Sequence, residues 1–466
     1  MMMLRLCKLL SLLIVAACLG ACASTSLFTP YPERAAAYKQ AIATNNFLAP
    51  LNDLDGHRKS ADKLLFMMER GRLEQLAGNT DASLADYADA IADYRASDNR
   101  ATISASHTVA LGAAMISNDN SIPYEGAPYE RIFLHQFQAL NYVAKGDLPG
   151  ALVEVRRANA LQEQARNEHQ KLMDDAKSDA DNKSVTVDPA RYQQYFGPLD
   201  DAANRVKDSF QNAYTFYTSG LLYEASGKLD DAYIDYKRAL EIYPDNPYVQ
   251  QDVLRLAQAL NRNDDVKALA GRVQLLPPPP PGSGAVVVLY EEGFAPVKRA
   301  ITIPFPIPYV WFTVSFPVYQ DAWAAGPPLH IVNGAQSLAS APIVDVQALA
   351  TRALKDDLYP MLVRQTLRAV AKHELQQQLQ QQGGDLLGFL GMAYNIISEQ
   401  ADLRSWLTLP HSAQIARMLL PPGPQTLTLQ TPYTQTTMTV PVSSGRITLL
   451  RVSNEGGRLY MASYPL

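Results

Sequence analysis

The chain has 466 residues, of which 41 are Lys or Arg and 46 are Asp or Glu, so its formal net charge is −5. A mildly acidic protein is a poor general binder of nucleic acid and of anionic lipid surfaces, and we expect neither as a partner. The length allows two or three domains. All 3 cysteines lie within the first 22 residues, which excludes disulfides, thiolate metal sites and a cysteine nucleophile from the rest of the chain.

The first residues have the pattern of a secretory signal peptide. Arg5 and Lys8 form a short basic region, and an apolar run over residues 9–21 follows it. This run is shorter than the about 20 apolar residues that a bilayer span needs, so we expect a processed signal and not a transmembrane anchor. We assign residues 1–21 to a lipoprotein signal peptide and residues 22–32 to a tether.

The end of the apolar run predicts a lipid anchor. Residues 19–22, Leu-Gly-Ala-Cys, match a lipobox, in which small residues precede the cysteine whose thiol accepts the lipid. An earlier lipobox ends at Cys18, which is the alternative attachment site. Ala23 follows Cys22, whereas an aspartate at that position tends to retain lipoproteins at the inner membrane of Gram-negative bacteria. We therefore expect a lipid on Cys22 that anchors the protein in the outer membrane, facing the periplasm.

Residues 33–275 predict a helical-repeat domain of the tetratricopeptide (TPR) type, an irregular α-solenoid. In the clearest unit, residues 213–246, small, aromatic and turn-forming residues stand where the two helices of such a hairpin touch, pack and turn. The residues at these positions are Gly220, Tyr223, Gly227, Leu229, Ala232, Tyr236, Ala239 and Pro244. A second unit with the same spacing lies at residues 139–158.

The rest of this region is less regular. A weaker repeat unit is built on Gly71, Gly78, Tyr87 and Ala90. A helix pair at residues 249–272 is expected to cap the array. Residues 117–128 and 174–198 are polar and rich in turn formers, so we expect them to be insertions between helical hairpins.

A domain boundary is predicted at residues 276–284. Five consecutive prolines at residues 277–281 are followed by Gly-Ser-Gly. A run of this composition is extended and packs no core. We therefore expect few essential contacts between the regions on its two sides.

Residues 285–466 predict a C-terminal α+β domain in which two groups of β-strands flank a helical segment. Apolar patterns of strand type occur at residues 285–290, 297–304, 311–319, 329–332, 425–430, 437–442, 446–452 and 458–463.

The helical segment between the strand groups has three predicted parts. Apolar residues recur at helical spacing over residues 345–382, with Pro360 as the expected kink. Residues 383–395 are apolar and glycine-rich, which favours a closely packed helix over a hairpin that touches the membrane. Residues 397–406 are predicted to be helical.

Two groups of polar residues are candidate functional clusters. The first cluster consists of Glu130, Arg131, Tyr142, Arg156 and Arg157, together with Tyr129, His135, Asn141, Glu154 and Asn159. We expect these side chains to gather at one end of a helical hairpin, as a structural clamp or as a ligand groove. The five residues named first are therefore our candidate binding residues.

The second cluster lies around a turn at Leu409-Pro410. Its members are Glu399, Asp402, Arg404, Trp406 and Arg417. An aspartate, an arginine and a tryptophan this close in sequence are expected to lock a helix to the sheet, and a binding hot spot is the alternative.

Motifs for catalysis and for phosphate or dinucleotide binding do not occur in the sequence. The 7 histidines are scattered, and no two of them have the spacing of metal ligands on a helix. We therefore assign no catalytic residue, no metal site and no cofactor.

The sequence resembles an uncharacterised family of proteobacterial TPR-containing lipoproteins. The resemblance is carried by Tyr129-Glu130-Arg131, Ala139-Leu140-Asn141-Tyr142, Gly146-Asp147, Glu154, Arg156-Arg157, Ala401-Asp402-Leu403-Arg404-Ser405-Trp406 and Leu409-Pro410. Members of this family are often encoded beside a lipoprotein resembling LpoB, the outer-membrane activator of a peptidoglycan synthase, and they have no assigned catalytic residues.

Together, the pattern and the resemblance imply a non-catalytic scaffold. We expect it to bind a protein partner in peptidoglycan or envelope assembly, with such a synthase activator as one candidate, through the concave surface of the solenoid. The alternatives are a cell-wall-acting enzyme with an unrecognised site and a structural subunit of an envelope machine.

Overall fold

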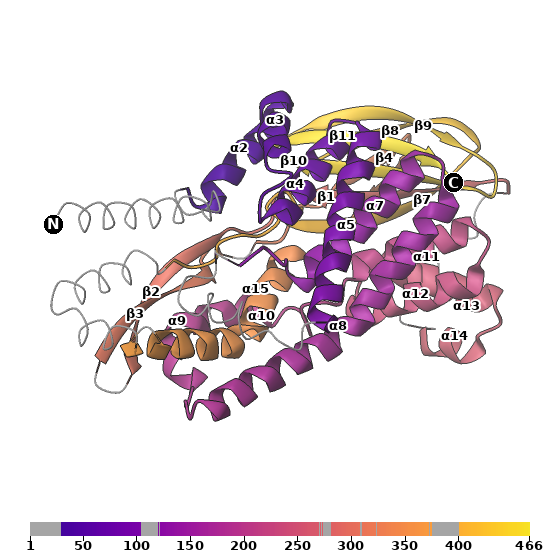
Figure 1. Cartoon of the computed structure of the whole chain (residues 1–466). Helices are drawn as coiled ribbons and strands as arrows, with labels where there is room; N and C mark the ends of the chain where they lie inside the picture. Colours follow the sequence, from indigo (N-terminus) through magenta and orange to yellow (C-terminus); the bar gives the residue numbers. More distant parts are fainter. Residues whose placement is uncertain are drawn as a thin grey trace, which may run out of the picture.

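The computed structural model describes residues 29–103, 120, 122–269, 271, 273, 281–307, 310–322, 324–371, 373–374 and 400–466. The predicted signal peptide, Cys18, Cys22, Glu399 and the apolar segment 383–395 lie outside the described residues. The fold is a mixture of helices and sheets, as predicted (Figure 1). In the described parts of the chain, no helix is long and apolar enough to cross a membrane.

Helices make up most of the first part of the chain. They are α2 (Tyr31–Thr44), α3 (Leu48–Gly56), α4 (Lys63–Leu76), α5 (Thr80–Ile103), α7 (Pro128–Ala144), α8 (Leu148–Asn182), α9 (Gln193–Phe196), α10 (Asp200–Ala203), α11 (Ala213–Ala225), α12 (Leu229–Ile242), α13 (Pro247–Ala259) and α14 (Asn263–Leu269). The pairs α4–α5, α7–α8 and α11–α12 pack side by side as antiparallel hairpins.

The sequence sets the turns and the starts of these hairpins locally. Gly78, Gly146 and Gly227 end the first helix of each pair with φ of 84°, 72° and 78°, a conformation that glycine adopts without steric cost. Asp147 and Asn212 cap the following helices, because their side chains accept hydrogen bonds from otherwise unpaired backbone N–H groups.

Small residues lie where the helices of a pair cross. A Cβ atom on Gly220 would lie 2.7 Å from the Tyr236 ring, and one on Gly71 would lie 2.4 Å from the Tyr87 ring. Ala232 is fully buried, as predicted. Helix α8 continues to Asn182, so the first part of the predicted insertion at residues 174–198 is helical instead.

The strands form two sheets and a separate hairpin. Their bounds are β1 (Gly284–Glu292), β2 (Lys298–Ile307), β3 (Val310–Tyr319), β4 (His330–Asn333), β5 (Gln336–Ala339), β6 (Ala341–Asp345), β7 (Ser412–Leu420), β8 (Gly423–Gln430), β9 (Gln435–Val442), β10 (Ile447–Glu455) and β11 (Arg458–Pro465). The five-stranded sheet has the order β11-β10-β1-β7-β6, and the four-stranded sheet has the order β5-β4-β8-β9. Among the described strands, β2 and β3 pair only with each other.

The five-stranded sheet is the middle of three layers. Val286, Val288 and Tyr290 of β1 belong to the core shared with the four-stranded sheet. Val287 and Leu289, on the other face of the same strand, belong to the core shared with the helices. A strand buried on both faces explains the continuous apolar run of β1.

The expectation of few contacts across the Pro-rich boundary is wrong. One continuous apolar core contains residues of both regions, from Tyr38 of α2 to Leu449 of β10. Buried ion pairs also cross the boundary, such as that between Arg72 of α4 and Glu291 of β1. The helices and the five-stranded sheet therefore bury a common core.

Two local predictions in the C-terminal region are also wrong, and three strands were missed. Residues 400–406 are not helical. The helical segment after residue 345 consists of α15 (Val346–Asp356) and a second helical stretch over 358–371, and it breaks at Asp357, before Pro360. Strands β5, β6 and β7 were not predicted.

Candidate functional site

The five candidate binding residues of the first cluster do not form one site, so the prediction that they gather is wrong. Glu130 is fully buried, whereas its neighbour Arg131 pairs with Asp98 on α5. Arg157 pairs with Glu154, whose carboxylate also lies 2.6 Å from the Nδ1 atom of His135.

The remaining two candidates, Tyr142 and Arg156, lie apart from Glu130. Tyr142 is half-buried and packs on the apolar core. Arg156 is exposed and lines a shallow groove between α8 and α12. Adjacent positions on a helix point in different directions, which explains why residues close in sequence separate here.

Residues 401–411, which we call the Trp406 loop, form a hydrogen bond with the carboxylate of Glu130. The Trp406 backbone N–H donates to Glu130 Oε1 at 2.8 Å. The Leu407 and Thr408 backbone N–H groups donate to the Glu69 carboxylate at 2.8 and 3.2 Å. The loop is thereby fixed to α7 and α4 through its main chain.

Side chains of the loop add to this attachment. Arg404 pairs with Asp62 and, at 2.8 Å, with Asp402. The Trp406 ring is fully buried and meets the rings of Tyr87 and Phe137 edge-on. The second cluster is therefore a lock, but it holds a loop to the helices and not a helix to the sheet.

Hydrogen bonds offset part of the free-energy cost of burying the Glu69 carboxylate. It accepts bonds from Thr408 and, at 2.8 Å, from the Tyr31 hydroxyl. Burial raises the pKa of Glu69 to about 7, although these bonds act in the opposite direction. A carboxylate without such donors would be far more costly at this depth.

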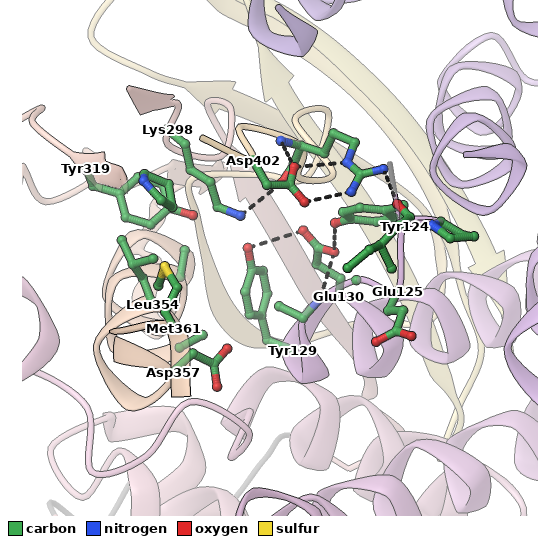
Figure 2. A pocket seen from close by; sticks show the side chains of 18 of the residues that line it. Tyr124, Glu125, Tyr129, Glu130, Lys298, Tyr319, Leu354, Asp357, Met361 and Asp402 are labelled. Atoms are coloured by element: carbon green, nitrogen blue, oxygen red, sulfur yellow. Dashed lines mark hydrogen bonds and ion pairs between the residues drawn. The ribbon is translucent and has the colours of Figure 1, made fainter. Parts of the chain in front are cut away.

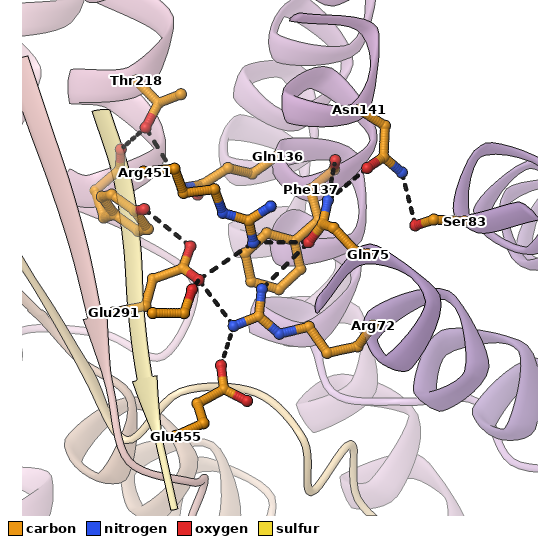
Figure 3. A network of polar contacts seen from close by, with 12 residues as sticks. Arg72, Gln75, Ser83, Gln136, Phe137, Asn141, Thr218, Glu291, Arg451 and Glu455 are labelled. Carbon is orange, nitrogen blue, oxygen red and sulfur yellow. Dashed lines mark hydrogen bonds and ion pairs between the residues drawn. The ribbon is translucent and has the colours of Figure 1, made fainter. Parts of the chain in front are cut away.

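A second buried network joins α4 to the five-stranded sheet (Figure 3). Arg72 Nη2 lies 2.8 Å from Glu291 Oε2 and also contacts Glu455. Arg451 Nη2 lies 3.2 Å from Glu291, and the Tyr214 hydroxyl donates to Glu291 at 3.0 Å. This network connects α4, α11, β1 and β10.

The two carboxyl groups of this network differ in pKa. Burial raises the pKa of Glu291, but Arg451 and Arg72 more than offset this effect, and the pKa falls to about 2. Burial raises the pKa of Glu455 to about 7. The network therefore holds one firmly charged carboxylate and one that exchanges its proton near neutrality.

Arg417 belongs to a third network and not to the second cluster. It lies 2.8 Å from Glu224 of α11 and 2.9 Å from Asp252 of α13. Arg255 bonds to the same two carboxylates. Arg417 thus ties β7 to the last helices, so its grouping with Arg404 is wrong.

A polar cavity of about 230 Å³ lies beside the Trp406 loop (Figure 2). Its walls come from residues 122–127, the start of α7, the β2–β3 hairpin, α15 with the stretch that follows it, and residues 402–404. Lys298 and Tyr319 enter it from the hairpin, and Tyr129 enters it from α7. We take this cavity as the candidate functional site.

Seven charged residues line the cavity, and five of them, all except Glu125 and Arg364, fall into two sets. Glu130 and the Arg404–Asp402 pair are engaged in the lock described above. Among the described residues, Lys298 makes one hydrogen bond, from Nζ to the Arg404 carbonyl oxygen at 2.9 Å. The Asp357 carboxyl group has no hydrogen-bond partner among the described residues, and burial raises its pKa to about 6.

Asp357 and Lys298 were not singled out from the sequence, and neither were Glu69 and Glu291. For the two glutamates a signal was present, because each directly follows an apolar run, Leu-Leu-Phe-Met-Met for Glu69 and Val-Val-Val-Leu-Tyr for Glu291. Among the described residues, no group of three or more His, Cys, Asp or Glu side chains is placed to hold a metal ion.

Comparison of the chain with protein-family models, with curated proteins and with solved structures finds no match. The resemblance to a family of TPR-containing lipoproteins therefore remains a prediction from the residues that carry it.

Proposed function

We propose that this protein is a lipid-anchored, non-catalytic scaffold at the outer membrane, facing the periplasm, that binds a protein partner in peptidoglycan or envelope assembly. Cys22 is the proposed anchor. The helical hairpins are the proposed TPR-like solenoid, and the sheets are built onto it. The observation that carries the proposal is a free sheet edge, strand β9, which pairs on one side only among the described strands.

The inner side of the proposed solenoid is filled by the chain itself. The first helices of the hairpins, α4, α7 and α11, send Arg72, Phe137 and Tyr214 into the network around Glu291 and Arg451. Helix α13 reaches β7 through Asp252 and Arg417. A partner would thus have to displace buried ion pairs to bind on this side, so the partner site lies elsewhere.

Strand β9 offers such a site. Among the described strands it pairs only with β8, in an unbroken register from Gln435↔Gln430 to Val442↔Gly423. The Thr431 N–H donates to the Thr434 carbonyl at the hairpin turn. Because antiparallel pairs alternate, the backbone groups of Gln435, Thr437 and Thr439 point away from β8, toward the free edge.

The composition of β9 leaves this edge open to pairing. No charged residue occurs from residue 418 to residue 445, although 19% of the chain is charged. Proteins usually block a free edge with lysine, proline, a bulge or a covering element. In β9 only Pro441 is of this kind, and its carbonyl already accepts a bond from the Thr448 hydroxyl.

The other three sheet edges carry protection. Strand β6 has a register shift between Pro342 and Val344 and contacts α11. Strand β11 contacts α2, and its first residue is Arg458. Strand β5 has only 4 residues. The contrast supports a partner that adds an extended, uncharged segment to β9 as a further strand.

Two edge variants test this proposal in the full, lipidated chain. Thr437→Pro removes an N–H that points to the free edge, and Thr437→Lys adds a charge there. Thr426→Lys is the matched control, since Thr426 is exposed on β8, one strand inside the edge. Crosslinking in cells, followed by identification of the captured protein, should lose the same partner in both edge variants and retain it in the control.

Equal capture by all three variants would contradict strand addition at β9. A cell-wall-acting enzyme is the second candidate function, favoured by the carboxyl group of Asp357 in the cavity. Its test is the digestion of purified peptidoglycan by the intact protein. Digestion that Asp357→Asn abolishes would replace the scaffold proposal.

A further inference from the structure

We propose that the cavity beside the Trp406 loop binds a small zwitterion, an amino acid or a short peptide that carries both a free ammonium and a free carboxylate. This proposal is independent of the scaffold function, because the cavity and the β9 edge are built from different strands. It rests on two charged residues that line the cavity, Lys298 and Asp357, neither of which has an ion pair within 4.0 Å among the described residues.

Most charge at the cavity is already balanced within the protein. The Glu130 carboxylate accepts hydrogen bonds from the backbone N–H groups of Trp406 and Ala127 and from the hydroxyls of Tyr124 and Tyr129. These four donors occupy its capacity, since an ionised carboxylate has about four lone-pair sites. Glu130 therefore offers nothing to a ligand.

The guanidinium of Arg404 is balanced as well. It is bonded to Asp402, to Asp62 and to the Ile122 carbonyl oxygen. Three acceptors from three segments fix its plane and leave no free charge at the cavity wall. The same pairing neutralises Asp402.

Two further charged residues line the cavity, but Glu125 is exposed to solvent and Arg364 is engaged in an interaction of its own. Two groups of opposite sign remain on facing elements. Lys298 of β2 has one acceptor in the described part of the chain, the Arg404 carbonyl, so two of its three N–H donors are available to a ligand. Asp357, between α15 and the helical stretch 358–371, lines the same cavity without a hydrogen-bond partner among the described residues. No ion pair within 4.0 Å joins the two, and a zwitterion would bridge them.

The other wall of the cavity is apolar and aromatic. Leu354 and Met361 lie beside Asp357, and Tyr319 lies beside Lys298 (Figure 2). These side chains can cover a short aliphatic side chain between the two charged ends. At about 230 Å³, the cavity is smaller than the pockets that take drug-sized ligands, which have about 300–1,000 Å³.

Other ligand classes fit this charge pattern less well. A simple anion would bind near Lys298 but would be repelled by Asp357, and a simple cation would face the reverse conflict. A neutral sugar would bring no charged partner to the Asp357 carboxylate, which His169, Arg364 and Lys298 stabilise only from a distance, without a hydrogen bond. Only a ligand with both charges satisfies both ends at once.

Isothermal titration calorimetry on the mature protein tests the proposal, with L-alanyl-L-alanine as the probe. The same dipeptide with an acetylated amino end and an amidated carboxyl end has no charge and should not bind. Lys298→Gln and Asp357→Asn should each weaken binding of the free dipeptide by at least about tenfold, because each leaves one ligand charge unpaired. Arg238→Gln, in the groove between α8 and α12, is the control.

Each outcome decides the question. Equal binding of the blocked dipeptide, unchanged binding by both cavity variants, or no binding of the free dipeptide at millimolar concentration would overturn the proposal. Unfolding midpoints of the variants, measured in parallel, show whether a loss comes from misfolding. Partner capture through β9 should be unchanged in both cavity variants, so that the two proposals fail separately.

Discussion

Replacing Arg72 with methionine should destabilise the whole protein, because the change removes a charge from the centre of the molecule. The side chains of Arg72, Glu291 and Glu455 are all fully buried. Methionine keeps much of the apolar stem but leaves the two carboxylates with Arg451 alone. Removing one partner of a buried ion pair costs about 3–5 kcal/mol in free energy of unfolding.

The pKa of Glu455 places the expected loss at the lower end of that range. This group has a pKa of about 7, so in the variant it can take up a proton and leave Glu291 paired with Arg451. We expect a loss of about 3 kcal/mol near neutral pH, and Glu455→Gln added to Arg72→Met should recover part of it.

Urea unfolding, followed by circular dichroism and by tryptophan fluorescence, measures this loss. Arg262→Ala is the control, because the pair of Arg262 with Asp230 has exposed fractions of 52% and 68% and should contribute less than about 1 kcal/mol. Helices and sheets share one core, so both signals should shift together in the Arg72 variant. A loss below about 1 kcal/mol, or a shift in one signal alone, would refute the reasoning.

Three further predictions concern the anchor, the helical packing and the cavity. Cys22→Ala should release the protein from membranes in a fractionation experiment, and release by Cys18→Ala instead would identify the other cysteine as the anchor. Ala232→Trp should lower the unfolding free energy by about 1–3 kcal/mol or more, since Ala232 is fully buried at a helix crossing; an unchanged urea midpoint would contradict the packing. Dipeptide binding should be strongest near pH 7 and weaken as the pH falls through about 6, because the Asp357 carboxyl, with a pKa of about 6, then loses its charge; it should also weaken above about pH 8, where the dipeptide's ammonium loses its proton. Calorimetry in the Asp357→Asn variant should show no loss on the acid side.

Features set by neighbouring residues were predictable from the sequence. The turn glycines Gly146 and Gly227 have positive φ, and the continuous apolar run at the start of β1 is a strand. In each case the residues involved determine the conformation through their own sterics or periodicity. The same local signals predicted a helical first part of the chain and a second part that mixes strands and helices.

Features that depend on distant partners were not predictable in this way. Strand β7 contains Gln414 and Arg417, which interrupt its apolar pattern, and both are satisfied by distant groups. Arg417 reaches Glu224 and Asp252, more than 160 residues away in the chain. A single sequence holds no record of such pairings, so the strand and its network were missed.

The first cluster shows the same limit for a functional site. Glu130 and Arg131 are adjacent in sequence, yet Glu130 faces the Trp406 loop and Arg131 faces α5. Residues that are close in sequence and were grouped as one cluster therefore lie in different places in the fold. Conversely, the cavity unites Lys298 and Asp357, which are far apart in the chain and have no common motif.

The shared core also determines how function can be tested. Dividing the chain at the Pro-rich run would expose Glu69 and Glu130 on the helices and would leave the Trp406 loop without the acceptors that hold its backbone. It would also leave Glu291 and Arg72 on different fragments, each a buried charge without its partner. A fragment that failed to bind would then report misfolding and not the position of a site. Point substitutions at the β9 edge and in the cavity leave these pairs intact, and they are therefore the changes that can separate binding from folding in this protein.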